Sequence, residues 1–327
     1  MRRAAPSLLV LLLLHTALLS DSCFRFFPGS FTVVGTEPAY AVSKSAFVSL
    51  RCPEGRRVLA HDRIRGLCLF EGRAERPFLL AEAEPPLFFC PSEEPRRVTV
   101  LSHPSGIEAG KVKGSFATAG ALFSSCCRLA GIVDADGGWF GADAIGDLLA
   151  GKVCHADTGL RFADTNGGGT VVRQIDPYRS IPLLPGDTIV EAGGVKHPSS
   201  RALEKRIDRC EAGGSIAFAV QRGERRFWVE ILCSKRMGGG KLSDTFLERF
   251  GLWFDDALRI VQIDPEGEAY AAGLRVGDRL LGIESDDVAT QDDVRESLTR
   301  FAVKKRVPRR MLWERDGLQF FLALPSI

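Results

Sequence analysis

Short apolar runs, separated by glycine, proline or charged clusters, mark the first half of the chain. Runs of this length and punctuation are typical of β-strands rather than helices. A strand is expected in each of these segments: Phe31–Val34, Phe47–Leu50, Leu67–Phe70, Leu87–Phe89, Val98–Leu101 and Leu129–Val133. Only Ala142–Leu149, which follows a glycine-rich loop, has helical spacing. The pattern therefore predicts a small β-barrel or sandwich.

From about Cys154 the pattern changes to longer strands arranged around one helix. Leu203 and Ile207 lie four residues apart on one helical face, and Ser199 or Ser200 can cap the helix start. The predicted order is strand, strand, helical turn, strand, helix, two strands. The expected strands are Gly159–Phe162, Thr170–Ile175, Thr188–Ala192, Ser215–Val220 and Arg226–Leu232.

The same order recurs about 90 residues later, so the chain contains an internal repeat. The segments 172–177 and 260–265 match nearly residue for residue, and both copies carry a Gly-Asp turn before an apolar strand. A glycine-rich linker, residues 236–242, joins the two copies. The elements expected in the second copy are strands at Phe250–Phe254, Leu258–Ile263, Arg309–Trp313 and Leu318–Leu324, with a helix at Gln291–Phe301.

Both copies resemble PDZ domains, small β-rich modules that bind ends of other polypeptides. The resemblance implies that a guest peptide adds as a strand against the second helix, with its carboxylate held by backbone N–H groups of a glycine loop. The same apolar residues would be core in any such fold, so both roles stay open. The implied peptide-binding residues are Thr158, Gly159, Leu160, Leu203 and Ile207 in the first copy, and Phe250, Gly251, Leu252, Val294 and Leu298 in the second.

Composition and charge narrow the class of protein. The 327 residues are 45% hydrophobic and 26% charged, which is the balance of a globular protein with real cores. The net charge of +2 gives little support to a nucleic-acid partner.

Nine cysteines show no CxxC pair, so neither a metal site nor another cofactor is predicted. An oxidising compartment would permit bridges such as Cys52 with Cys90, but the sequence leaves the connectivity open.

The first 22 residues have the composition of a targeting segment. Arg2 and Arg3 precede an apolar run that ends near Leu19, followed by small residues before Cys23. We interpret residues 1–22 as a cleaved secretory signal, with a mitochondrial presequence or an uncleaved anchor as alternatives. The rest of the chain has no apolar run long enough to span a membrane, so the mature protein is expected to be soluble in the secretory pathway or secreted.

The segment 23–153, followed by two PDZ-like copies, resembles the HtrA (DegP-like) serine proteases. The stretch Phe116–Phe123 looks like the nucleophile loop of that family, and Gly137–Leu149 is similar to the segment that ends its protease domain. The stretches Val98–Gly106 and His61–Phe70 resemble the loop before the active site and the strand that carries the triad aspartate. The implied domains are a protease-like β domain at 23–153 and PDZ domains at 154–235 and 243–327.

The catalytic residues of that family are not present at the matching positions. The nucleophile position holds Thr118, the aspartate position holds Gly66, and residues 40–50, where the general base belongs, contain no histidine. A hydroxyl nucleophile needs a positioned imidazole and a carboxylate that orients it. We therefore expect a degenerate protease domain with an eroded first barrel, or an unrelated small β domain.

A shifted alignment would leave an active enzyme. Its nucleophile would be Ser115 or Ser124, its base His61 or His103, and its orienting acid Asp62.

The sequence as a whole predicts a mainly β protein that captures extended or C-terminal peptide segments, as an adaptor or quality-control protein. One alternative is an active HtrA-like endopeptidase regulated by its PDZ domains. Another is a structural subunit of a larger complex, and a homo-oligomer is also open.

Overall fold

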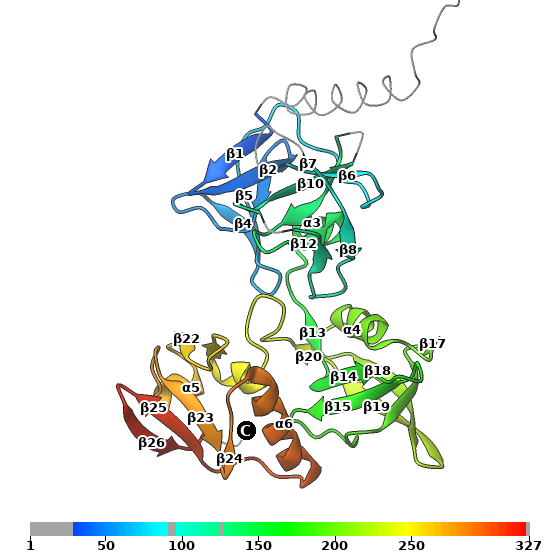
Figure 1. The fold of residues 1–327 in the computed structure, drawn as a ribbon, viewed down its shortest axis with the longest axis vertical. Helices are drawn as coiled ribbons and strands as arrows, with labels where there is room; N and C mark the ends of the chain where they lie inside the picture. Colours follow the sequence, from blue (N-terminus) through cyan, green and yellow to red (C-terminus); the bar gives the residue numbers. More distant parts are fainter. Residues whose placement is uncertain (1–28, 91–95, 115, 125–126, 325–327) are drawn as a thin grey trace, which may run out of the picture. The chain divides into compact units, whose positions relative to one another are not determined.

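The computed structural model describes residues 29–90, 96–114, 116–124 and 127–324. The predicted targeting segment, residues 1–22, lies outside the described residues. The chain divides into two compact units, the first reaching to residue 153 and the second holding residues 154–327 together with 105–107 (Figure 1). Within the described ranges, no helix is long and apolar enough to cross a membrane.

The first unit contains a five-stranded antiparallel sheet in the order β1-β2-β3-β5-β4. The predicted strands near residues 31, 47 and 67 are present, whereas the predicted strands do not include β2, whose apolar residues alternate with small or polar ones, or β4, which ends in His61 and Asp62. Phe47 of β3 lies opposite Phe70 of β5 and stacks on it at 5.9 Å between ring centroids. The strands are β1 Phe31–Val34, β2 Glu37–Ser43, β3 Ala46–Ser49, β4 Val58–Asp62 and β5 Leu67–Glu71.

The same unit contains a seven-stranded sheet in the order β7-β6-β10-β11-β12-β9-β8. The predicted strand Val98–Leu101 is wrong as one element, because it breaks at Thr99 into β7 and β8, which form the two opposite edges. One residue separates those edges along the chain, so the sheet must curl into a barrel. Its elements are β6 Leu87–Cys90, β7 Arg96–Val98, β8 Val100–Ser102, β9 Gly110–Val112, β10 Gly120–Ser124, β11 Leu129–Val133, β12 Gly138–Gly141 and the predicted helix α3 Ala142–Leu149.

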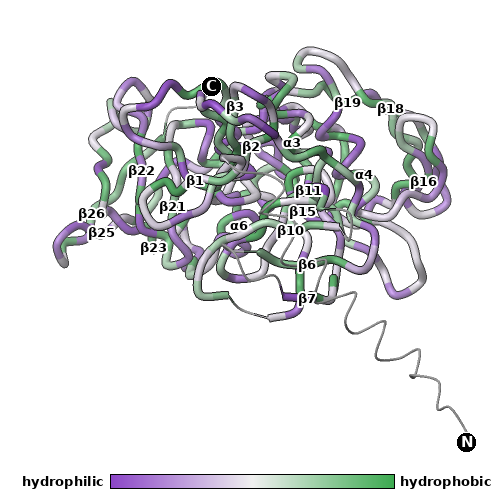
Figure 2. Tube along the Cα trace, turned by 90° about the horizontal axis from the view of Figure 1, so that it is seen from above, coloured by the Kyte–Doolittle hydropathy of each residue, from purple (hydrophilic) through white to green (hydrophobic). Residues whose placement is uncertain are grey.

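The barrel strands β6, β10 and β11 supply the apolar interior of the first unit. The run Leu87–Cys90 is hydrophobic along its whole length (Figure 2). Trp139 of β12 and Ile145 of α3 are no more than 1% exposed. The chain is therefore mainly β, and the barrel in its first unit is of the kind that the resemblance to the trypsin-like HtrA proteases implies.

The disulfides correct the pairing given as an example from the sequence. Cys52 is bonded to Cys68, not to Cys90, and Cys210 is bonded to Cys233. The reason is the register of β3 against β5, which sets Ser49 opposite Cys68 and so brings the loop after β3 to that strand. Cys90 is a buried free thiol whose pKa is raised to about 12 by burial.

The second unit begins with the first repeat, residues 154–235, built around the sheet β14-β15-β16-β18-β19 with β17 paired to β16. Helix α4 is capped by Ser199, whose hydroxyl accepts the N–H of Ala202. The helical turn predicted before Gly186 is absent, since Pro182 and Pro185 lack the N–H groups that a helix needs. The elements are β13 Ala156–Asp157, β14 Leu160–Asp164, β15 Thr170–Ile175, β16 Thr188–Ala192, β17 Val195–Lys196, α4 Ser200–Asp208, β18 Ser215–Arg222, β19 Arg225–Leu232 and β20 Ser234–Lys235.

The second repeat, residues 243–327, has a two-stranded sheet β21-β22 and a four-stranded sheet β24-β23-β25-β26. Thr290 and Asp293 form a capping box that starts α6, which lies beside β15 of the first repeat (Figure 1). The elements are the 3-10 turn η1 Leu247–Phe250, β21 Leu252–Phe254, β22 Ile260–Ile263, α5 Glu268–Ala271, β23 Arg279–Ile283, β24 Asp286–Asp287, α6 Gln291–Val303, β25 Met311–Arg315 and β26 Leu318–Leu322.

The Gly-Asp turn has the same construction in both repeats. Asp187 accepts two hydrogen bonds of 2.6 Å from Arg222, and Asp278 accepts bonds of 2.6 and 2.7 Å from Arg315. Each aspartate also accepts a backbone N–H three residues earlier in the chain. A buried carboxylate that fixes a turn and a C-terminal strand at once explains why both copies keep this residue.

Candidate functional site

The residues predicted to bind peptide in the second repeat lie in its hydrophobic core. Phe250, Leu252, Val294 and Leu298 are at most 1% exposed and belong to one cluster with Trp313. They connect η1 and β21 on one side with α6 on the other, which are the two walls of the predicted site.

Gly251 stands between those walls with φ +80°, and an added Cβ would lie 2.7 Å from the Cβ of Asp264. Only glycine fits this turn, so the glycine of the predicted loop has a definite structural reason.

The first repeat has the same arrangement, and its loop is covered. Leu160, Leu203 and Ile207 are each 1% exposed and share one core. Gly159 has φ +73°, and a Cβ there would lie 2.6 Å from Cδ of Arg179. Thr158 is fully buried. The structure thus brings the predicted residues of each repeat together, as packed core residues.

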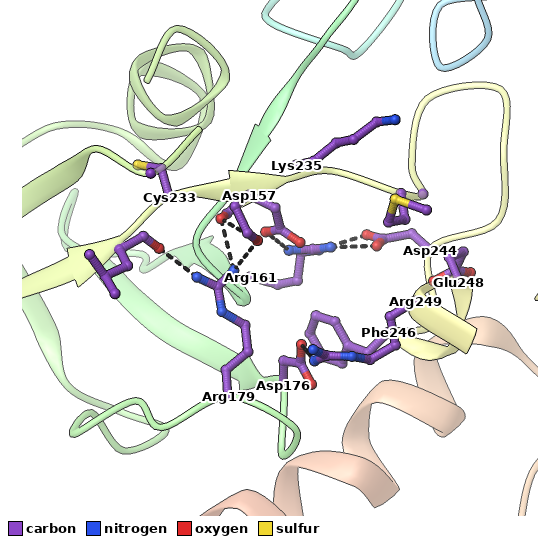
Figure 3. Close-up of a pocket in the computed structure, with 15 residues that line it drawn as sticks. Asp157, Arg161, Asp176, Arg179, Cys233, Lys235, Asp244, Phe246, Glu248 and Arg249 are labelled. Carbon is purple, nitrogen blue, oxygen red and sulfur yellow. Dashed lines mark hydrogen bonds and ion pairs between the residues drawn. The ribbon is translucent and has the colours of Figure 1, made fainter. Parts of the chain in front are cut away.

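A pocket of about 500 Å³ opens in the second unit beside both glycine loops, and its lining is strongly charged (Figure 3). Several of its residues were not singled out from the sequence, because charges in turns have no periodic signal. One local clue was available, since Arg249 directly precedes Phe250 in the predicted loop. The charged residues that line the pocket include Asp157, Arg161, Asp176, Asp244, Glu248 and Arg249.

Arg161 of β14 is the centre of this charge cluster. Its guanidinium donates to Asp244 at 2.7 and 2.5 Å and to Asp157 at 3.0 Å (Figure 3). Burial acts to raise the pKa of Asp244, but Arg161, with Arg236 and Arg295, holds that pKa well below its usual range. The cluster therefore keeps Asp244 ionised at all physiological pH values.

A second ion pair joins the repeats at η1. Arg249 donates to Asp176 at 2.9 Å, and the ring of Tyr178 meets Phe250 edge-on at 4.8 Å. Burial raises the pKa of Asp176 to about 6 and outweighs the opposing effect of Arg249. A segment of the first repeat thus rests on the loop that the PDZ resemblance assigns to carboxylate binding.

Glu248 of η1 is 2% exposed, and no basic side chain of the described residues lies within ion-pair distance of it. Its carboxylate accepts hydrogen bonds from Ser243 Oγ (2.7 Å), Thr245 Oγ1 (2.8 Å) and Thr245 N (3.0 Å). Burial, reinforced by the charge of Asp244, raises the pKa of Glu248 to about 7. This acid therefore titrates near neutrality.

The positions matched to a catalytic triad lie in the first unit. Thr118 is exposed in the loop before β10, and Gly66 has φ +68° in the turn between β4 and β5. Residues 40–49 fall on β2, β3 and the turn between them, and the bonded Cys52 lies three residues after β3.

Comparison with known proteins agrees with this architecture. The chain is 29% identical over 179 residues to a probable periplasmic serine endoprotease, DegP-like, from Halomonas elongata, a match that covers 48% of this chain and 37% of that protein. The solved structure of the HtrA-type protease AlgW with tripeptide superimposes with a TM-score of 0.52 at 12% identity, covering 66% of this chain and 97% of that one. The chain is related to the HtrA proteases. No protein-family model matches it.

The match to the HtrA relative spans little more than a third of that protein's own length. The AlgW likeness, at 12% identity, establishes the fold of the chain and nothing about its chemistry. Another solved structure, the serine endoprotease from Yersinia pestis, is similar with a TM-score of 0.45 at 10% identity, covering 66% of this chain and 98% of that one.

The alternative HtrA-type catalytic residues are not brought together among the described residues. His61 is exposed on β4 while its neighbour Asp62 is buried, as successive residues of a strand point to opposite faces. Asp62 instead accepts the N–H of Arg65 at 3.0 Å. His103 meets the ring of Trp139 edge-on at 5.6 Å.

Neither candidate serine is shown next to a general base. The hydroxyl of Ser124 accepts the N–H of Arg128 at 3.3 Å. Ser115 lies outside the described residues. Neither His61 nor His103 has a hydrogen bond to a serine or threonine hydroxyl among the described residues of the first unit.

Proposed function

We propose that this chain is a non-catalytic relative of the HtrA proteases that binds extended or C-terminal peptide segments through two PDZ domains. The domains would be residues 154–235 and 243–327, joined by the linker 236–242, behind a protease-like domain at residues 23–153. The observation that carries the proposal is the repeated architecture. In both copies, a loop with a positive-φ glycine and a helix enclose apolar residues at equivalent positions. The AlgW structure with tripeptide adds support, because that HtrA-type protein holds a peptide.

The non-catalytic part of the proposal rests on the residues at the triad positions. Thr118 has no imidazole partner in the described chain, and Gly66 has no side chain with which to orient one. A hydroxyl at neutral pH is a weak nucleophile without a general base. The protease-like barrel would then serve as a scaffold for the peptide-binding domains.

An active HtrA-like endopeptidase is the second candidate. The 29% identity to a probable DegP-like serine endoprotease favours it, because that relative is described as an enzyme. In this case the nucleophile would have to be a residue other than the aligned Thr118, or Thr118 itself with a base from outside the described residues.

We place the protein in an oxidising compartment, either the secretory pathway or a cell envelope. The Cys52–Cys68 and Cys210–Cys233 bonds are of the kind that persists outside the cytosol. The DegP-like relative is described as periplasmic, and the basic, then apolar, first residues of the chain agree with export.

The two candidates separate in one experiment on the chain from Cys23 onward. An unfolded protein such as casein is incubated with the chain and with its Thr118→Ala variant, while fluorescent free-acid and amidated peptide pools, random in their last four residues, are tested for binding. We expect no cleavage and saturable binding of the free-acid pool alone. Cleavage that is lost in Thr118→Ala would establish the endopeptidase, and cleavage that persists would point to another nucleophile.

A further inference from the structure

The segment Ser243–Phe246, which directly precedes η1, bridges the two walls of the predicted peptide site in the second repeat. The hydroxyl of Ser243 accepts the backbone N–H of Phe254 in β21 at 3.1 Å. The backbone N–H of Asp244 donates to the side chain of Gln291 at 2.8 Å, and its carbonyl accepts from Arg295, both on α6. The segment is thus bound by the strand through the Ser243 side chain and by the helix through the main chain of Asp244, so it contacts both walls as a guest peptide would.

The strand β21 has an edge available for such an occupant. Among the described residues its one strand partner is β22, so its other edge forms no ladder. An added peptide strand uses an edge of this kind. Here the N–H of Phe254 is already taken by Ser243, and Phe246 is buried in the core of the repeat at 5% exposure.

The first repeat holds this segment at two of its residues, Asp244 and Phe246. Arg161 of β14 grips the carboxylate of Asp244 in a two-bond fork, and its guanidinium also lies over the ring of Phe246 at 4.8 Å. Arg236, which follows β20 and is 5% exposed, adds a contact of 3.5 Å to Asp244. Figure 3 shows Arg161 reaching from the first repeat to Asp244. A fork to a carboxylate fixes orientation as well as position.

We propose that residues 243–246 are a built-in occupant of the second repeat's peptide site, and that Arg161 of the first repeat locks this occupant in place. This inference rests on the proposed peptide-binding function. An outside peptide binds the second repeat only after the segment leaves, so its apparent affinity is reduced by the fraction of molecules that are open. Separation of the two repeats, which breaks the Arg161 fork, is the event that opens the site.

The test uses the whole chain from Cys23 and two variants that act from different repeats. Asp244→Asn removes the charge that the fork binds, and Arg161→Gln removes the fork without touching the second repeat. Asp256→Asn, an exposed aspartate of the second repeat, is the matched control. Hydrogen exchange of the Phe254 amide reports release of the segment, and anisotropy of the labelled free-acid peptide pool reports binding.

We expect Phe254 exchange to rise at least about tenfold in both variants, and the peptide pool to bind at least about tenfold more tightly, with no change in Asp256→Asn. Unchanged exchange and affinity in the folded variants would overturn the inference, even if the wild-type chain binds peptide. Equal acceleration at the Leu280 amide, which donates to the Leu258 carbonyl in the body of the repeat, would mean general unfolding and would also overturn it.

The exchange measurement separates this inference from the proposed function. Faster Phe254 exchange without peptide binding in any variant would support release of the segment, while removing the proposed peptide-binding function. Arg161→Gln changes the first repeat and Asp244→Asn changes the second. If one variant fails to fold, the other still tests whether the ion pair holds the segment.

Discussion

Glu248→Gln should remove a pH dependence from the second repeat. Glu248 is 2% exposed with a pKa of about 7, against an ordinary value of about 4.3 in an unfolded chain. The folded state therefore holds the proton more tightly than the unfolded state. The contribution to stability is complete below pH about 4 and is lost as the pH rises through 7.

The magnitude follows from the difference between the two pKa values. At about 1.4 kcal/mol per pH unit, the difference of about 2.7 between the two pKa values makes an ionised Glu248 cost about 4 kcal/mol in the folded state at pH 8 and above. Glutamine keeps an oxygen for the Ser243 and Thr245 donors and carries no charge. The variant should thus be more stable than the wild type at pH 8 and close to it below pH about 4.

The assay is native-state hydrogen exchange of the Leu280 amide in the full chain, corrected for intrinsic rates, between pH 6 and 8. Burial also raises the pKa of Asp176, to about 6, and that of Glu204, so the difference in slope between wild type and Glu248→Gln, not the wild-type slope alone, reports Glu248. Glu266→Gln, at an exposed position of the same repeat, is the control. If wild type and Glu248→Gln show the same slope of opening free energy across this window, burial does not perturb Glu248 as argued.

Three further predictions concern stability. Trp313→Ala should cost about 3–5 kcal/mol in denaturant unfolding of the second repeat, because this side chain is fully buried, and a cost below about 1 kcal/mol would contradict that packing. Replacing Cys210 and Cys233 by serine opens a loop with a sequence separation of 23 and should lower stability by about 3 kcal/mol, with the wild type in reductant falling to the same level. A double-mutant cycle on Arg161 and Asp244 should give a coupling free energy of about 2 kcal/mol in exchange of second-repeat amides, whereas strictly additive effects would show that the fork does not couple the repeats.

Local signals in the sequence were sufficient for the helices and the repeat. Ala142–Leu149 was predicted with the same bounds that α3 has, and the helix predicted over 291–301 differs from α6 only in its last residues. Both elements are specified by their own residues, through an apolar face and, in α6, a capping box. The two Gly-Asp turns were likewise visible, since a turn and its carboxylate lie within a few residues of each other.

The sequence did not predict which strands and cysteines pair when they lie far apart in the chain. The break at Thr99 leaves no mark in an apolar run, because it is imposed by the closing of the barrel. The partner of Cys52 depended on the register of β3 against β5, and spacing alone does not fix a register.

The sequence by itself determined the kinds of elements, their order and the repetition of the last two modules, because those depend on neighbours in the chain. The tertiary structure alone decided which charges meet. Arg161 and Asp244 are 83 positions apart in the chain, and the sequence gives no sign that either is more than an ordinary surface charge. Their fork, and the segment that it holds against β21 and α6, exist because folding desolvates both groups at one place, where opposite charges must pair.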